Sequence, residues 1–130
     1  MNCIFCKIAK KEIKSYLIYE DDISIAFLDI NPLSRGHILF VPKKHYKTLS
    51  EIPDGELAEL MKSLKRVLNI VEEKLSKNYN IINNCGKIAG QEIEHVHIHI
   101  VPRYGGEEIF LWKTHKLTEE EAEDILKRLK

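Results

Sequence analysis

His95-Val96-His97-Ile98-His99-Ile100-Val101-Pro102 places three of the chain's six histidines at alternate positions of one short segment. Successive side chains of a β-strand point to opposite faces, so the histidines share one face and the aliphatic residues share the other. Pro102 lacks a backbone N–H and would end such a strand. The pattern predicts a strand over residues 95–101, with one face in the core and the other available for chemistry.

The spacing of this segment assigns different roles to the three histidines. The strand rise separates neighbouring histidines by about 6.6 Å and the outer two by about 13 Å, so one metal ion cannot bind all three. The middle residue, His97, has a polar neighbour on each side. It can attack phosphorus if a backbone carbonyl or a carboxylate fixes the attacking tautomer.

The sequence around this segment predicts further strands and helices. Apolar spacing favours a short helix over residues 3–11, and the polar pair Asp21-Asp22 between two apolar runs favours a hairpin of residues 16–19 and 23–29. Residues 37–42 form a nearly continuous apolar run, typical of a strand buried on both faces. A further strand is expected over residues 79–83.

Two helices follow from longer periodic patterns. Asp54 can cap a long helix with an apolar stripe formed by Leu57, Leu60, Met61, Leu64, Leu68, Val71 and Leu75. Near the end of the chain, Thr118 and Glu121 form a capping box before a second amphipathic stretch. We expect this last helix to pack on the surface of the sheet.

Length and charge limit the classes of function. The chain has 130 residues and is 44% hydrophobic, which suits one domain, and its 20 basic and 20 acidic residues cancel. This balance favours neither a nucleic acid nor a membrane as the principal partner. No apolar run approaches the length of a membrane span, and no signal-peptide pattern is present, so we expect a cytoplasmic protein.

The motifs together resemble the histidine triad (HIT) family. The resemblance extends from Cys3-Ile-Phe-Cys6-Lys-Ile8 through Ala26-Phe27-Leu28-Asp29-Ile30-Asn31-Pro32 and Gly36-His37-Ile-Leu-Phe-Val-Pro42-Lys43-Lys44-His45. It continues through Asn84-x-Gly86-x-x-Ala-Gly90-Gln91 to the triad and Arg103. A lone His-x-His-x-His would be a weak signal, whereas these segments in this order are specific.

This resemblance implies an α+β fold, with a five-stranded antiparallel sheet, a short N-terminal helix, one long central helix and a C-terminal helix. The whole chain, residues 1–130, would be a single HIT domain with a core over 3–103 and a variable segment over 104–130. The variable segment contains Tyr104, Trp112 and the last helix, and leaving-group specificity is one role open to it. The family also implies a homodimer.

The family implies hydrolysis or transfer of a nucleotide through a covalent intermediate on His97. His99 would contact the α-phosphate and His37 would support the His97 site, while Asn84 and Gln91 would donate to phosphate oxygens. Asp29 would accept the ribose hydroxyls. The walls of the purine site would be Ile4, Phe5, Ile8, Phe27 and Ile30, although each of these could equally be ordinary core.

The implied substrates are purine nucleotide phosphoramidates, acyl adenylates or dinucleoside polyphosphates, with no magnesium needed for the chemistry. Glu92 departs from many relatives, which have a Ser or Thr there that helps the leaving group. Two alternatives remain: a zinc hydrolase that activates water, and a nucleotide-binding scaffold with little turnover.

Cys3-x-x-Cys6 has the spacing of half a tetrahedral zinc site, and His45 and His95 are candidates to complete it. A redox pair or two inert cysteines are the alternatives. In the zinc-containing branch of the family the corresponding four residues bind the metal. The resemblance therefore implies a structural zinc held by Cys3, Cys6, His45 and His95.

Overall fold

The computed structural model describes residues 3–107, 109 and 113–130, so Trp112 lies outside the described residues. The elements follow in the order α1 (Ile4–Ala9), β1 (Leu17–Glu20), β2 (Ser24–Leu28), β3 (Ile38–Pro42), η1 (Leu49–Glu51), α2 (Asp54–Lys74), β4 (Tyr79–Ile82), η2 (Lys87–Ala89), β5 (Ile98–Pro102) and α3 (Glu119–Leu129). The predicted hairpin, strands and helices are all present.

The strands form one antiparallel sheet in the order β1-β2-β3-β5-β4, which confirms the predicted five-stranded α+β fold. β5 begins at Ile98, three residues later than expected, because pairing with β3 stops at Phe40. Before that point, the Val96 N–H donates to the Tyr46 carbonyl, and Nε2 of His95 donates to the Pro42 carbonyl. His95 and His97 thus lie in the segment that leads into β5.

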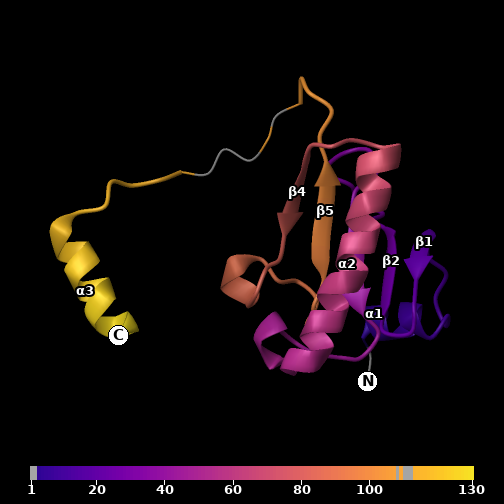
Figure 1. Cartoon of the computed structure of the whole chain (residues 1–130), viewed down its shortest axis with the longest axis horizontal. Coiled ribbons are helices and arrows are strands. Elements are labelled where there is room, and N and C mark those ends of the chain that lie inside the picture. The colour runs from indigo at the N-terminus through magenta and orange to yellow at the C-terminus, as the bar shows by residue number, and fades with distance from the viewer. Residues whose placement is uncertain (1–2, 108, 110–112) are drawn as a thin grey trace.

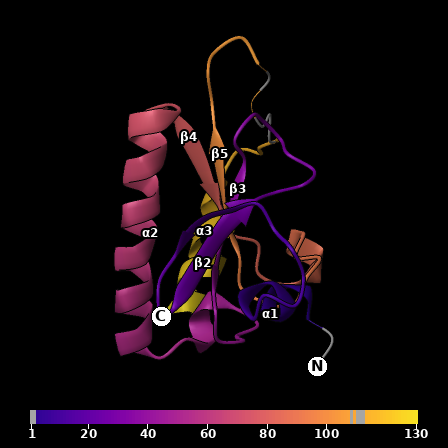
Figure 2. The same cartoon turned by 90° about the vertical axis from the view of Figure 1, so that its right-hand side faces the viewer.

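The two faces of the sheet carry separate apolar clusters, as the alternating pattern requires. One cluster contains Val96, Ile98 and Ile100 together with Phe40 of β3 and Val67 of α2. The opposite cluster consists of Cys3, Phe5, Ile8, Ile25, Phe27, Leu39 and Val41. Figure 2 shows α2 on one side of the sheet and α1 on the other. The histidines belong to the α1 side.

α2 follows the predicted apolar stripe in its centre but not at its ends. Leu60, Leu64 and Val71 are buried, whereas Met61 and Leu75 are more than a third exposed. Pro53 occupies the N-cap position and no side chain caps the helix, so the predicted capping role of Asp54 is wrong. Asp54 is instead the first helical residue, where its charge suits the positive end of the helix dipole.

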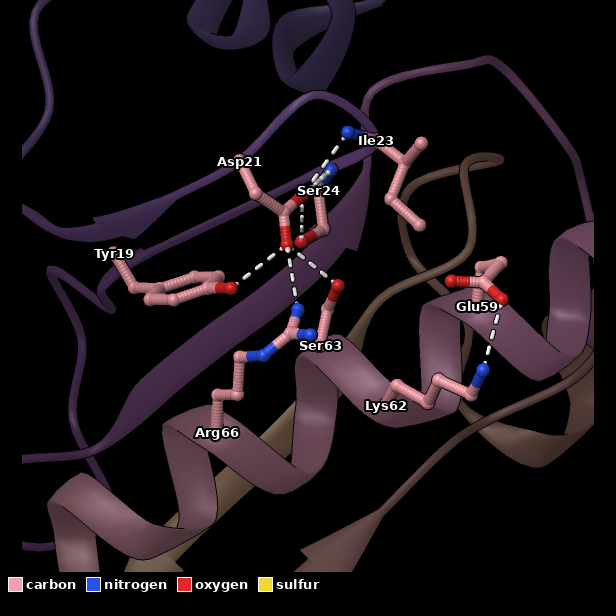
Figure 3. Close-up of polar contacts among 8 residues, drawn as sticks. All are labelled: Tyr19, Asp21, Ile23, Ser24, Glu59, Lys62, Ser63 and Arg66. Carbon is pink, nitrogen blue, oxygen red and sulfur yellow. Dashed lines mark hydrogen bonds and ion pairs between the residues drawn. The ribbon is translucent and has the colours of Figure 1, made fainter.

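The hairpin is joined to α2 through the carboxylate of Asp21 (Figure 3). Ser63 of α2 and Tyr19 of β1 donate hydroxyl hydrogens to Oδ2 at 2.5 and 2.8 Å. The backbone N–H and hydroxyl of Ser24 donate to Oδ1 at 2.8 and 2.9 Å. Arg66 lies 3.8 Å away as an ion pair. These contacts hold the β1–β2 turn against the long helix.

The C-terminal helix does not pack on the sheet, contrary to the expectation from its sequence. Thr118 caps α3 by accepting from the Glu121 N–H, as predicted, but no residue of α3 is buried. Figure 1 shows the helix standing apart from the sheet. Among the described residues, no helix combines the length and apolar character needed to cross a membrane.

Candidate active site

The His97 ring is held in one tautomer by the backbone of His95. Its Nδ1 lies 2.8 Å from the His95 carbonyl oxygen, which can only accept, so Nδ1 carries the proton. The lone pair is therefore on Nε2. Phe5 fixes the ring from the side, with centroids 5.0 Å apart, and the residue is 7% exposed. This arrangement fixes the direction of the Nε2 lone pair, as attack on phosphorus would require.

A second chain of hydrogen bonds fixes His37 and His99. The Leu33 N–H donates to Nδ1 of His37 at 2.9 Å, so the proton of His37 is on Nε2. That Nε2 lies 3.0 Å from Nδ1 of His99 and donates to it. His99 consequently carries its own proton on Nε2. The loop backbone at Leu33 thus sets the protons of two histidines.

Burial keeps these two rings neutral. Desolvation lowers the pKa of His37, against the opposing charge of Asp29. Desolvation, with smaller contributions from His97 and His37, lowers the pKa of His99 to about 4. Both rings are therefore neutral at pH 7, as the hydrogen-bond chain requires. Neutral His99 can offer one N–H to a ligand without adding a fixed positive charge.

His97, His99 and His37 line one cavity of about 580 Å³, a volume suited to a small-molecule ligand. The rings of His97 and His99 are 5.1 Å apart. The cavity also takes in Asp29, Asn84 and the predicted apolar wall residues Ile4, Phe5, Ile8, Phe27 and Ile30. Residues from both halves of the sequence thus line the same cavity.

The wall residues divide into two kinds. Phe5, Ile8 and Phe27 are at most 7% exposed and also belong to the core on the α1 side. Ile4 and Ile30 are 44% and 79% exposed at the cavity and give an open apolar surface. Asp29 accepts from the Asn31 N–H through Oδ1, while its Oδ2 lies 3.6 Å from Nε2 of His37. Its remaining acceptor capacity is available to a ligand.

Gln91 is buried but does not line the cavity. Its Nε2 donates to the carbonyls of Lys47 and Ile93, and its Oε1 accepts from the Gly86 N–H. Both amide hydrogens are therefore occupied by backbone oxygens. The predicted phosphate contact of Gln91 does not fit this geometry, in which the side chain braces the loop that carries Asn84.

Cys3, Cys6, His45 and His95 bring one ligand atom each to within 4.8 Å of one another. Sulfur-to-Nδ1 distances are 3.3 Å for Cys3–His95, 3.3 Å for Cys6–His45 and 3.5 Å for Cys6–His95. A tetrahedral zinc with ordinary bond lengths separates such atoms by about 3.6 Å. Nε2 of His95 donates to the Pro42 carbonyl, which leaves its Nδ1 lone pair facing the sulfurs.

Asp29, His37 and His99 form a second group of closely spaced ligand atoms. A metal on Nε2 of His37 would require that nitrogen to lose its proton, while Nδ1 already accepts from Leu33. The proton would have to leave the ring or displace the Leu33 contact. This group is better described as a hydrogen-bond relay than as a metal site.

Three groups of the site escape sequence reasoning. The Leu33 N–H and the Pro42 carbonyl are backbone groups, which no residue type reveals. Asn83 donates its side-chain amide to the His97 carbonyl at 3.0 Å and so holds the main chain beside the nucleophile. Its position at the end of the strand predicted over residues 79–83, directly before Asn84, is the signal that the sequence offers.

Comparison with known proteins gives consistent matches. A model of the HIT domain matches residues 10–106. A HIT-like protein of Methanocaldococcus jannaschii is 44% identical over 128 residues, which cover 98% of each chain. Adenosine 5'-monophosphoramidase of Saccharomyces cerevisiae is 48% identical over 101 residues, or 78% of this chain and 62% of the yeast protein. Adenylylsulfatase of Arabidopsis thaliana is 43% identical over 117 residues, or 89% of this chain and 58% of the plant protein.

Comparison with solved structures also finds a member of the HIT family. A crystal structure of a HIT family member from Bacillus subtilis matches with a TM-score of 0.89 and 34% sequence identity. The match covers 99% of this chain and 95% of that chain.

Proposed function

The chain belongs to the HIT domain family, and on that premise we propose that it hydrolyses or transfers purine nucleotides through a covalent intermediate on His97. The observation that carries the proposal is the bond from Nδ1 of His97 to the His95 carbonyl, which leaves the Nε2 lone pair free. The names of the yeast and plant relatives support phosphoramidates and adenylyl compounds as substrates.

Two displacements at phosphorus complete the reaction. Nε2 of His97 forms a bond to the α-phosphorus as the bond to the leaving group breaks; a departing amine keeps the electron pair and gains a proton from solvent. Water then attacks phosphorus and loses a proton to solvent, so that an O–P bond forms as the N–P bond breaks and its electron pair returns to Nε2 of His97. The products are a nucleoside monophosphate, the amine and free His97.

Other groups of the cavity stabilise this chemistry. The N–H on Nε2 of His99 and the side-chain amide of Asn84 can donate to phosphate oxygens, whose negative charge grows during attack. A preorganised donor of this kind contributes about 2 to 4 kcal/mol. Asp29 accepts from the ribose hydroxyls, and the exposed faces of Ile4 and Ile30 hold the base.

The test is release of AMP from adenosine 5'-phosphoramidate by the wild type and His97→Ala, with His115→Ala as a control. His115 is exposed and pairs with Glu121, and neither residue lines the cavity. We expect turnover by the wild type and the control, and none by His97→Ala. Comparable turnover by His97→Ala would refute the nucleophile. Absence of turnover in all three would favour a binding scaffold.

We further propose that the cluster of Cys3, Cys6, His45 and His95 holds a structural zinc, which needs neutral imidazoles. Desolvation lowers the pKa of His95, against the bond to Pro42, and so keeps this ring neutral at pH 7. Four protein ligands close the coordination sphere and tie α1 to the sheet. Purified protein should contain one equivalent of zinc, and Cys6→Ser should contain much less and melt lower. Metal-free protein of unchanged stability would refute this site.

The same proposal includes a homodimer in the cytoplasm. β4 forms one edge of the sheet, and its Ile81 is 49% exposed, which makes this edge available for pairing. Sedimentation equilibrium should give twice the mass of one chain. Ile81→Lys should shift this equilibrium toward the monomer, and a concentration-independent monomer in the wild type would refute the dimer.

A further inference from the structure

Glu92 lines the same cavity as His97, and its side chain is exposed. Within the described part of the chain it has no hydrogen bond and no ion pair. Its neighbour Glu94 differs, since that carboxylate lies 3.7 Å from Lys47 and does not line the cavity. Glu92 thus presents to the cavity a carboxylate that forms no ion pair with any cation of the described residues, although Lys14 also lines the cavity.

The charged lining residues of the cavity, Lys14, Asp29 and Glu92, come from separate parts of the chain. Lys14 and Asp29 belong to segments that are joined by the bond from the Leu28 N–H to the Tyr16 carbonyl. Glu92 follows Gln91 in the loop braced against Gly86, on the same wall as Asn84 and Gly90. Glu92 therefore enters the cavity lining from a different segment than Asp29, which is proposed to hold the ribose.

The geometry of the displacement at phosphorus determines whether the leaving group can reach Glu92. In an in-line displacement the leaving group departs on the side of phosphorus opposite the attacking Nε2 of His97. His97 lines the cavity and is only 7% exposed, so a leaving group opposite its Nε2 points away from the buried ring, toward solvent. Glu92, which is exposed at the cavity, is placed to interact with substituents of the leaving group.

We infer that Glu92 selects the leaving group by charge, favouring nucleoside phosphoramidates of cationic amines over those of anionic amines. This inference rests on the proposed function. A positive substituent on the departing amine is attracted by the carboxylate, whereas sulfate, polyphosphate or carboxylate groups are repelled. The bonds made and broken remain those of the two displacements above, and the charged substituent leaves unchanged.

The test uses three adenosine 5'-phosphoramidates that differ in the charge of the leaving amine. The amines are (2-aminoethyl)trimethylammonium, its neutral isostere 3,3-dimethylbutylamine, and taurine. Values of kcat/KM are measured for the wild type, Glu92→Gln and the control Glu94→Gln. Differences in the intrinsic reactivity of the amines cancel when the same substrate ratio is compared between variants.

We expect Glu92→Gln to lower the cationic-to-neutral ratio about tenfold relative to the wild type and to raise the anionic-to-neutral ratio by a similar factor. Glu94→Gln should leave both ratios near the wild-type values. Raising the salt concentration from 0.02 to 0.5 M should weaken the wild-type preference, since exposed charges are screened.

The possible failures are distinguishable. Turnover that depends on His97 but shows unchanged ratios in Glu92→Gln would overturn the inference and leave the proposed function standing. Equal changes in Glu92→Gln and Glu94→Gln would indicate a diffuse field rather than a specific residue, and would also overturn it. Absence of turnover of all three compounds by the wild type would overturn both.

Discussion

Single atoms of the backbone decide which nitrogen of each active-site histidine carries the proton. The His95 carbonyl sets His97, the Leu33 N–H sets His37, and His37 in turn sets His99. Each ring is thus oriented before a ligand arrives, which lowers the reorganisation needed during attack.

Substitutions of His37 should separate the two halves of the relay. Gln can place an N–H near the position of Nε2, whereas Asn can only reach the position of Nδ1. We expect His37→Asn to lower kcat about 10- to 100-fold with a smaller change in KM, because His99 loses the donor that fixes its proton. His37→Gln should recover part of this loss. Equal kcat values for the two variants would contradict the relay.

The depressed pKa of His99 should be visible by NMR. Its folded pKa of about 4 lies below the ordinary value near 6.5, so the ring stays neutral as pH falls to about 5. The unfolded chain protonates His99 at a higher pH than the folded chain does. The free energy of unfolding therefore decreases as pH falls from about 6.5 toward 4. The His99 Cε1–H shift should be constant between pH 8 and 5.5. A midpoint above pH 6 would contradict the burial argument.

Sequence reasoning identified the side chains of the site better than their partners. The order of the motifs points to His97, His99, His37, Asp29 and Asn84, and all five line the cavity, whereas His95 faces the two cysteines. Gln91 was assigned to phosphate for the same reason, but its amide is taken up by backbone oxygens. A sequence pattern gives the donors and acceptors of side chains, and it does not give the main-chain groups that compete for them.

The contact between the hairpin and α2 depends on Asp21, whose role the sequence did not reveal. The pair Asp21-Asp22 predicted only a turn. In the structure, burial raises the pKa of the Asp21 carboxyl, but hydrogen bonds from Ser63, Tyr19, Ile23 and Ser24 outweigh burial and lower it well below its usual range. The helix periodicity that predicted α2 concerns apolar positions and passes over buried Ser63.

Asp21→Asn should therefore destabilise the fold by about 1 to 3 kcal/mol at pH 7. A carboxyl with a lowered folded pKa stabilises the protein above its unfolded value near 4 and loses this contribution as pH falls through the folded value. The difference in the free energy of urea unfolding between wild type and variant should shrink from pH 6 to pH 3.

The control is Glu59→Gln, because Glu59 pairs with Lys62 on the exposed face of α2. This substitution should change the free energy of unfolding by less than about 0.5 kcal/mol. A pH-independent difference for Asp21→Asn would contradict this account.

At the scale of the whole molecule, the sheet with α1 and α2 forms one unit and α3 stands outside it (Figure 1). Amphipathic periodicity predicted α3 and its cap, but a pattern shows which face of a helix is apolar and not what covers it. Ile125 and Leu126 are 44% and 50% exposed, so the expected packing on the sheet is absent in the single chain.

Removal of residues 108–130 should leave the remaining fold intact. Because α3 buries no residue, the truncated protein should keep its circular dichroism in the sheet region and melt within about 3 °C of the full chain at equal zinc content. Loss of a cooperative transition in the truncated protein would show that the C-terminal segment stabilises the sheet.

His95 contacts both the cysteine cluster and the His97 ring. Its Nδ1 faces the two cysteines, its Nε2 binds the Pro42 carbonyl, and its main-chain oxygen holds the proton of His97. One residue thus connects an anchoring site to the reacting nitrogen through a few covalent bonds. If zinc binds as proposed, oxidation of the cysteines or removal of the metal should disturb the alignment of His97 before the sheet unfolds, so turnover should fall with zinc content although zinc takes no part in the reaction.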